Sequence, residues 1–171
     1  MAHVLFLCTG NAARSVIAGA ALRARLPDLE IETAGTLAID GQPMSWRTRA
    51  ALEHVGLEAP AHRSRQATAL DVERAQLVIG LAPEHVLWTR RECPTAAGRT
   101  ATLKRLSRDL PDAAGVTLAE RVTALGLADV ALEPWAAVDD PGGGDAPQFV
   151  ACAEVVVELV DRLATTLSSL D

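Results

Sequence analysis

The sequence predicts an α/β fold with three layers, in which about four parallel strands form a twisted sheet covered by helices on both faces. Short apolar runs alternate along the chain with longer segments of helical spacing. The runs 4–7 and 75–81 are too short for helices and lack polar alternation, as is typical of buried parallel strands. Parallel neighbours need crossover connections, which place helices on both faces of the sheet. We find no repeat or long linker, and expect residues 1–171 to form a single domain.

The first strand, 4–7, ends at Cys8, and the helical pattern begins at Ser15 and stops before Pro27. Segment 29–33 alternates in polarity, which predicts a strand near an edge of the sheet. Further strands are expected at 75–81 and 101–104, a loop at 93–99, and helices at 44–55, from Thr68, at 83–91, from Thr117 and from Pro147.

Local capping signals support several of these helices. Gly56 suits the position just after the helix at 44–55. Thr68 and Thr117 are each followed three residues later by an acidic residue, the pattern of a capping box. Asp145 is well placed to cap the last helix.

Composition excludes several classes of function. The chain carries a net charge of −6, which argues against a general binder of nucleic acid or of anionic membranes. No apolar run reaches the roughly 18 residues that a membrane span needs, and we expect no secretion signal before the first strand. Three cysteines do not suggest a disulfide framework, so we expect a reducing, cytoplasmic location.

The loop between the first strand and the first helix is the strongest functional signal. Amide N–H groups at a helix N-terminus are unpaired and partly positive, so a loop folded onto one can bind an oxyanion. Arg14 adds a forked cationic donor. We expect the phosphate-binding residues to be Thr9, Gly10, Asn11, Ala12, Ala13, Arg14 and Ser15.

Cys8 would lie beneath the bound anion, in a field that favours its thiolate, the nucleophilic form. A buried cysteine at a strand end is usually inert. Cysteine followed after five residues by Arg-Ser, at a strand-to-helix junction, is much more specific. The loop is neither a Walker loop nor a dinucleotide fingerprint, because the required glycines and lysine are missing.

Phosphoryl transfer to a thiol also needs a proton for the leaving oxygen. Asp140, followed by Pro141 and three glycines, is the best candidate general acid. The same residues are also typical of a simple turn, and the two interpretations are compatible. Asp139 is the less favoured acid and could tune Asp140 through like-charge repulsion.

Residues 8–15 resemble the signature loop of the low-molecular-weight protein tyrosine phosphatases and the related arsenate reductases. The resemblance implies Cys8, Arg14 and Asp140 as catalytic residues and a mechanism without metal or cofactor. It also implies that Thr33 and His62 support the loop, because segments 33–36 and 62–66 look like the family's supporting stretches.

The chain departs from the family pattern in two places. Ala13 replaces a second loop cysteine that many members carry before the arginine, so rescue of an oxidised Cys8 would need an outside thiol. The aromatic residues that flank the substrate ring in tyrosine phosphatases are also missing, and Leu37, Ala38, Gly142 and Gly143 stand at those positions. This leaves room for a small phosphate ester beside phosphotyrosine.

Three functions remain open at this point. The first is a phosphomonoesterase with a cysteinyl-phosphate intermediate, acting on a phosphotyrosine protein or a small phosphate ester. The second is arsenate reduction by the same loop with an external thiol, because inorganic phosphate and arsenate are both expected ligands. The third is a non-catalytic module that binds phosphate or a phosphoprotein.

Overall fold

The computed structural model describes residues 3–170 and contains one four-stranded parallel sheet. Its strands are β1 (His3–Cys8), β2 (Glu30–Gly35), β3 (Leu77–Gly80) and β4 (Thr100–Thr102), in the order β2-β1-β3-β4. All three pairings are parallel. The predicted fold class is confirmed, and β2 lies at an edge as expected.

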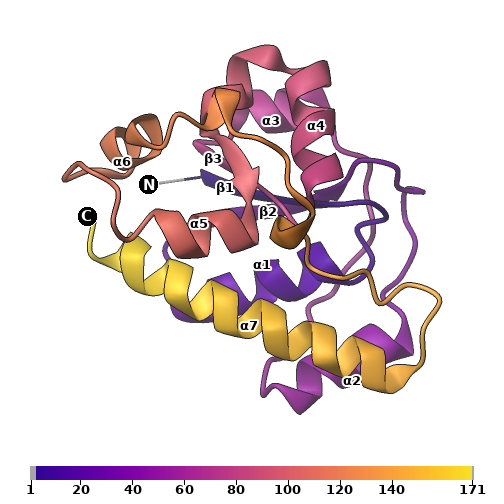
Figure 1. Cartoon of the computed structure of the whole chain (residues 1–171). Helices are drawn as coiled ribbons and strands as arrows, with labels where there is room; N and C mark the ends of the chain where they lie inside the picture. Colours follow the sequence, from indigo (N-terminus) through magenta and orange to yellow (C-terminus); the bar gives the residue numbers. More distant parts are fainter. Residues whose placement is uncertain (1–2, 171) are drawn as a thin grey trace.

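Helices cover both faces of the sheet (Figure 1). The α-helices are α1 (Arg14–Arg25), α2 (Trp46–His54), α3 (Ala69–Arg74), α4 (Pro83–Glu92), α5 (Leu103–Asp109), α6 (Leu118–Ala124) and α7 (Ala146–Ser168). Short 3₁₀ helices span Pro94–Arg99, Leu127–Asp129 and Pro134–Ala136. No helix within residues 3–170 is long and apolar enough to cross a membrane.

The core is divided by the sheet. Val4 and Phe6 of β1 point to one face, where they join a large apolar cluster with α1, α5 and the long helix α7. Leu5 and Leu7 point to the other face and pack in a smaller cluster with the α3 side. All four side chains are fully buried, which is why β1 reads as a continuous apolar run.

Two predictions about the chain after β3 were wrong. The strand expected at 101–104 ends at Thr102, and α5 begins at Leu103, because the Thr102 hydroxyl accepts from the Arg105 amide and caps that helix. The loop expected at 93–99 forms a 3₁₀ helix over most of its length.

Other local predictions hold with small shifts. The capping boxes at Thr68 and Thr117 are formed, and Asp145 occupies the N-cap of α7. The helix expected from about residue 44 begins at Trp46, because Ser45 caps it while Pro43 bridges to Arg63. Shifts of one or two residues at helix ends are common, because the ends of helices are less regular than their interiors.

The sheet brings the carboxyl ends of its strands to one edge. Cys8 of β1 pairs with Gly35 of β2, and its neighbour Leu7 pairs with Gly80 of β3. In open parallel sheets this edge is where ligands bind. The loops after β1, β2 and β3 therefore meet around Cys8.

Candidate active site

The loop from Cys8 to Ser15 joins β1 to α1 at the carboxyl edge of the sheet. Asn11 has a φ of +51°, a left-handed conformation that asparagine tolerates better than most residues. The Cys8 Sγ atom lies 3.0 Å from the Ser15 Oγ atom. Both side chains are buried, so the sulfur is held at the base of the loop rather than exposed beside it.

Asn11 connects this loop to β2 and to the segment after α2. Its Nδ2 donates to Ser15 Oγ and to Thr33 Oγ1, each at 3.0 Å, and its Oδ1 accepts from the Arg65 amide. The Asn11 carbonyl accepts from His62 Nε2 at 2.7 Å. Thr33 and His62, which the family resemblance placed beside the loop, both contact Asn11.

These bonds also set the direction of the Ser15 hydroxyl. Asn11 Nδ2 occupies one lone pair of Ser15 Oγ as a donor, so the hydroxyl proton is free to point at the Cys8 sulfur. A hydroxyl donor stabilises a thiolate relative to a thiol. The Ser15 hydroxyl is thus placed to donate to the Cys8 sulfur.

Gly35 allows β2 to approach the loop closely. A Cβ atom at this position would lie 2.5 Å from the Thr9 carbonyl oxygen and 3.0 Å from the Asn11 nitrogen. The next two amides, of Thr36 and Leu37, donate to the carbonyls of Cys8 and Thr9 at 2.9 and 3.0 Å. The first two carbonyls of the loop therefore accept from the segment that follows β2.

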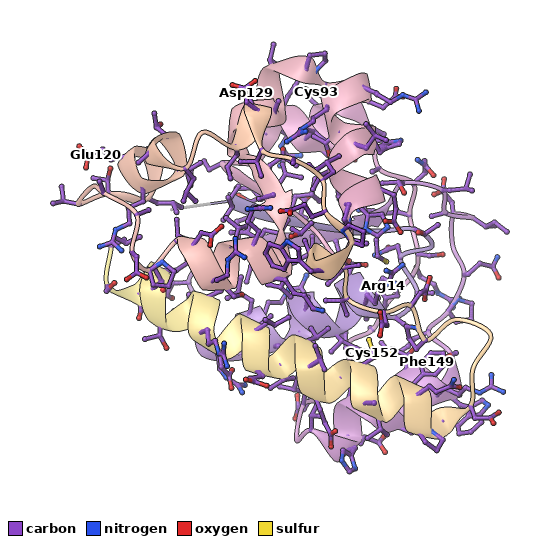
Figure 2. All side chains as sticks on the ribbon, viewed as in Figure 1. Arg14, Cys93, Glu120, Asp129, Phe149 and Cys152 are labelled. Atoms are coloured by element: carbon purple, nitrogen blue, oxygen red, sulfur yellow. The ribbon has the colours of Figure 1, made fainter. Side chains whose placement is uncertain are left out.

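Arg14 and Asp140 meet on the opposite side of the loop. The Arg14 side chain is only 4% exposed, and its guanidinium donates to the Val138 carbonyl at 3.1 Å and to Asp140 Oδ2 at 2.9 Å. Figure 2 shows Arg14 near the N-terminal half of α7, in the region that carries Cys152 and Phe149. Asp140 Oδ1 accepts from the Gly142 amide, so both carboxylate oxygens are engaged.

The sequence-predicted residues are thus brought together around one loop. Asp140, and not Asp139, makes the contact with Arg14. Both aspartates line a cavity of about 300 Å³ together with Lys104 and Gln148. Thr48 of α2 adds a further support, since its hydroxyl donates to the Ala12 carbonyl at 3.0 Å.

Sequence reasoning missed His85, which is fully buried next to the loop. Its Nε2 lies 3.0 Å from Thr9 Oγ1, and burial together with the nearby Arg14 charge lowers the pKa of this imidazole to about 3. The sequence offered one signal, because His85 lies in the first turn of a helix that follows a predicted strand. In the structure that strand, β3, ends beside Cys8. The order of strands that makes them neighbours was not known from the sequence.

The other two cysteines are also buried, and Cys152 lies close enough to Arg14, Asp140 and Cys8 for their charges to affect its pKa. Cys152 is buried in α7, and this desolvation raises the pKa of its thiol to about 12. Cys93 is buried near Thr95. Neither is joined to Cys8 by a disulfide.

Within residues 3–170, one group of side chains has the spacing of metal ligands, namely His3, Glu30 and Glu32. It lies at the amino ends of β1 and β2, away from Cys8. Arg65 contacts Glu32 at 2.8 Å and Arg74 contacts Glu30 at 3.6 Å. Because both carboxylates already face arginines, this group does not indicate a metal centre.

Comparison with known proteins agrees with this geometry. The family model of low molecular weight phosphotyrosine protein phosphatase matches residues 3–117. A protein-arginine-phosphatase of Geobacillus stearothermophilus is 30% identical over 168 residues, covering 98% of this chain and 97% of that protein. A low molecular weight protein-tyrosine-phosphatase of Streptomyces coelicolor is 36% identical over 113 residues, covering 62% of this chain and 67% of that protein.

The solved structure of an arginine phosphatase from Geobacillus stearothermophilus has a TM-score of 0.77 to this chain at 28% identity, covering 98% of this chain and 94% of that one. The similarity therefore includes the sheet, both helical layers and the segment that carries Asp140. The family model itself covers β1 through α5 and includes the whole loop from Cys8 to Ser15. The chain belongs to the low molecular weight phosphotyrosine protein phosphatase family, whose members are cysteine-based phosphatases that work without a metal.

Proposed function

We propose that this protein hydrolyses phosphate monoesters through a cysteinyl-phosphate intermediate on Cys8. One observation carries the proposal: the Cys8 sulfur lies 3.0 Å from a hydroxyl donor inside a loop whose other side is closed by Arg14 and Asp140, 2.9 Å apart. A nucleophile, an oxyanion site and an acid thus surround one small space. In this proposal residues 1–171 act as one domain.

The loop and Arg14 bind the phosphoryl group. Amides from Thr9 to Ser15 and the N-terminus of α1 present partial positive charge to the oxyanion, and Arg14 provides two parallel N–H donors. In the structure Arg14 donates to Asp140. Phosphoryl oxygens compete for that guanidinium, which releases the Asp140 carboxyl to face the leaving group.

In the first step the Cys8 thiolate attacks phosphorus in line with the ester oxygen. The S–P bond forms, the P–O bond to the alcohol breaks, and Asp140 gives its proton to the departing oxygen. The charge on the transferring group stays in contact with Arg14 and the fixed amides throughout. No metal takes part in this step.

In the second step water attacks the cysteinyl phosphate. The Asp140 carboxylate accepts a proton from the water, the new P–O bond forms, and the S–P bond breaks to release inorganic phosphate. The sulfur leaves as a thiolate, which the Ser15 hydroxyl stabilises through the same 3.0 Å contact. Because Asp140 takes this proton from the water, the enzyme is back in its starting protonation state, with a Cys8 thiolate and a protonated Asp140.

The mouth of the site has room for either a phosphorylated protein side chain or a small phosphate ester. Leu37 and Ile39, on the loop after β2, are 79% and 74% exposed, and Asp140 is followed by glycines rather than aromatic residues. A phenyl ring would find apolar contacts there without the aromatic stacking worth about 0.5 to 1.5 kcal/mol. Phosphotyrosine proteins and small phosphate esters therefore both fit.

A phosphorylated arginine is a second candidate. The relative that matches this chain over almost its full length is named as a protein-arginine-phosphatase. In this chain Asp139 and Asp140 are adjacent carboxyl groups at the mouth of the site. A guanidine leaving group becomes cationic when protonated, so two carboxyl groups suit it better than an aromatic wall does.

Hydrolysis of an aryl phosphate between pH 5 and 8, with EDTA present, tests the proposed chemistry. We expect turnover in the presence of EDTA and its loss in Cys8→Ser. Full activity in Cys8→Ser would contradict the mechanism. Phosphate or arsenate binding without turnover would favour arsenate reduction with an external thiol, or a binding role. A matched pair of peptides, one with phosphotyrosine and one with phosphoarginine, then compares the two substrates through kcat/KM.

A cytoplasmic location is part of the proposal. A thiolate nucleophile must stay reduced, and Ala13 leaves the loop without a neighbouring cysteine that could protect it. The three cysteines are all unpaired in the structure. A reducing compartment meets both conditions.

A further inference from the structure

His85 contacts the phosphate loop without being part of it. It lies in the first turn of α4, its ring is fully buried, and its Nε2 is 3.0 Å from the hydroxyl of Thr9. A Cβ atom on Gly80, at the end of β3, would meet the His85 Cβ at 3.0 Å. The close packing of α4 against β3 thus fixes the ring where it reaches the loop.

The hydrogen bonds of the ring determine its tautomer. The Ala82 amide donates to His85 Nδ1 at 3.0 Å, so Nδ1 carries no proton. This contact also caps α4, because Ala82 has no side-chain oxygen to do so. In the neutral ring the proton is therefore on Nε2, and Nε2 is the donor to Thr9 Oγ1.

The ring stays neutral at the pH values at which the enzyme would work. Burial is the main cause of its low pKa of about 3, and the Arg14 charge lowers the pKa further while Asp140 opposes this. The direction of the bond from Nε2 to Thr9 therefore does not change across that range.

A hydroxyl that accepts from His85 must direct its own proton elsewhere. Thr9 Oγ1 has no other hydrogen-bond partner within residues 3–170, and Thr9 is half-buried at the edge of the loop. The adjacent ligand with acceptor oxygens is the phosphoryl group that the loop would bind.

We propose that His85 is a positioning residue: its Nε2–H donates to Thr9 Oγ1 and so directs the Thr9 hydroxyl proton to an oxygen of the bound phosphoryl group. This inference rests on the proposed function, because it assigns a further donor to the same anion site. The Thr9 side chain would then bind the phosphoryl group in addition to the Thr9 backbone amide.

Two substitutions separate this role from the structural one. In His85→Asn, the Asn Oδ1 takes the place of Nδ1 and keeps the cap on Ala82, but the donor to Thr9 is lost. In His85→Gln, the Gln Nε2 takes the place of the ring Nε2 and keeps the donor, but the cap is lost. The probe is inorganic phosphate, measured as a competitive inhibitor of aryl phosphate hydrolysis, beside kcat, KM and the thermal unfolding midpoint.

We expect His85→Asn to raise the inhibition constant of phosphate and lower kcat/KM by about tenfold each, the effect of losing one hydrogen bond to a charged group. His85→Gln should recover most of this loss while unfolding at a lower temperature than His85→Asn. If phosphate binding instead follows thermal stability in the two variants, His85 has only a structural role and the inference is wrong.

A double substitution gives an independent check. Thr9→Val removes the hydroxyl and keeps the shape of the side chain, so adding His85→Asn to it should cause little further loss of phosphate affinity. Additive losses would contradict action through Thr9. Cys8-dependent hydrolysis by the unsubstituted protein tests the proposed function separately, so either proposal can fail without the other.

Discussion

The two sides of the phosphate loop are held in different ways. On the β2 side, Asn11 is fully buried and makes hydrogen bonds to Ser15, Thr33, Arg65 and His62. On the other side, Asp140 is more than half exposed, and its loop is tied to the site through Arg14 and continues into three glycines. One side is a network of hydrogen bonds around a buried asparagine, and the other joins the loop through the Arg14 guanidinium.

This difference separates two tasks of the site. Binding a tetrahedral anion benefits from donors that are fixed before the ligand arrives, because no reorganisation is then needed. Proton delivery to varied leaving groups needs a carboxyl that can adjust its position. The fixed side of the loop suits the first task, and the glycine-rich Asp140 loop suits the second.

The largest effect is expected on the Asp140 side. Asp140→Asn removes the proposed proton donor but keeps a group that can contact Arg14, so we expect kcat for an alkyl phosphate to fall by about 10² to 10³-fold. Phosphate inhibition should change much less, because the anion site itself is retained. Steady-state kinetics measures both quantities.

Asp139→Asn is the matched control for this change, since it removes the adjacent carboxyl, which does not contact Arg14. It should alter kcat by less than about threefold, in the range of a removed nearby charge. An equal or larger loss in Asp139→Asn would assign the acid to Asp139 instead.

An intermediate effect is expected on the fixed side. Gly35→Ala places a Cβ against the Thr9 carbonyl and the Asn11 nitrogen, both backbone atoms that cannot move aside easily. Such overpacking costs about 1 to 3 kcal/mol of unfolding free energy, and we expect weaker phosphate binding as the loop shifts. Urea unfolding and phosphate inhibition measure the two effects.

The control is Gly98→Ala, because no atom lies within 4 Å of a Cβ built at Gly98. Its unfolding free energy should change by no more than about 0.5 kcal/mol. If the two alanine variants are equally stable, the close approach of β2 does not constrain the conformation of the phosphate loop.

A separate effect concerns stability in acid. The pKa of His85 is about 3 in the folded protein, against about 6.5 for an ordinary histidine. As the pH falls from 6.5 towards 3, the unfolded chain binds a proton that the folded protein does not, so the free energy of unfolding decreases. This contribution approaches about 1.4 kcal/mol per pH unit.

His85→Asn lacks this group, so its stability should fall less steeply between pH 6.5 and 4.5 than that of the unsubstituted protein. Urea unfolding at several pH values makes the comparison. Parallel curves for His85→Asn and the unsubstituted protein would show that His85 titrates normally.

Much of this site could be predicted because it is contiguous in the sequence. The apolar run before Cys8, the short loop and the helical spacing after Ser15 together specify a strand, a turn and a helix start, and these place Cys8 and Arg14 around one oxyanion site. Asp140 could also be predicted, since an acid followed by proline and glycines stands out within a long non-helical segment. The fold class followed from the alternation of buried strands with amphipathic helices.

The tertiary structure decided the contacts between distant segments. The Asn11 side chain accepts a hydrogen bond from the Arg65 amide, and Arg14 donates one to the Val138 carbonyl. A pattern of side chains in the sequence does not predict which backbone group will be the partner. His85 reaches Thr9 only because β3 lies beside β1 in the strand order. The strand predicted at 101–104 ends early because Thr102 caps α5. Sequence patterns report local conformation and burial, whereas the register and order of strands depend on how the whole core packs together.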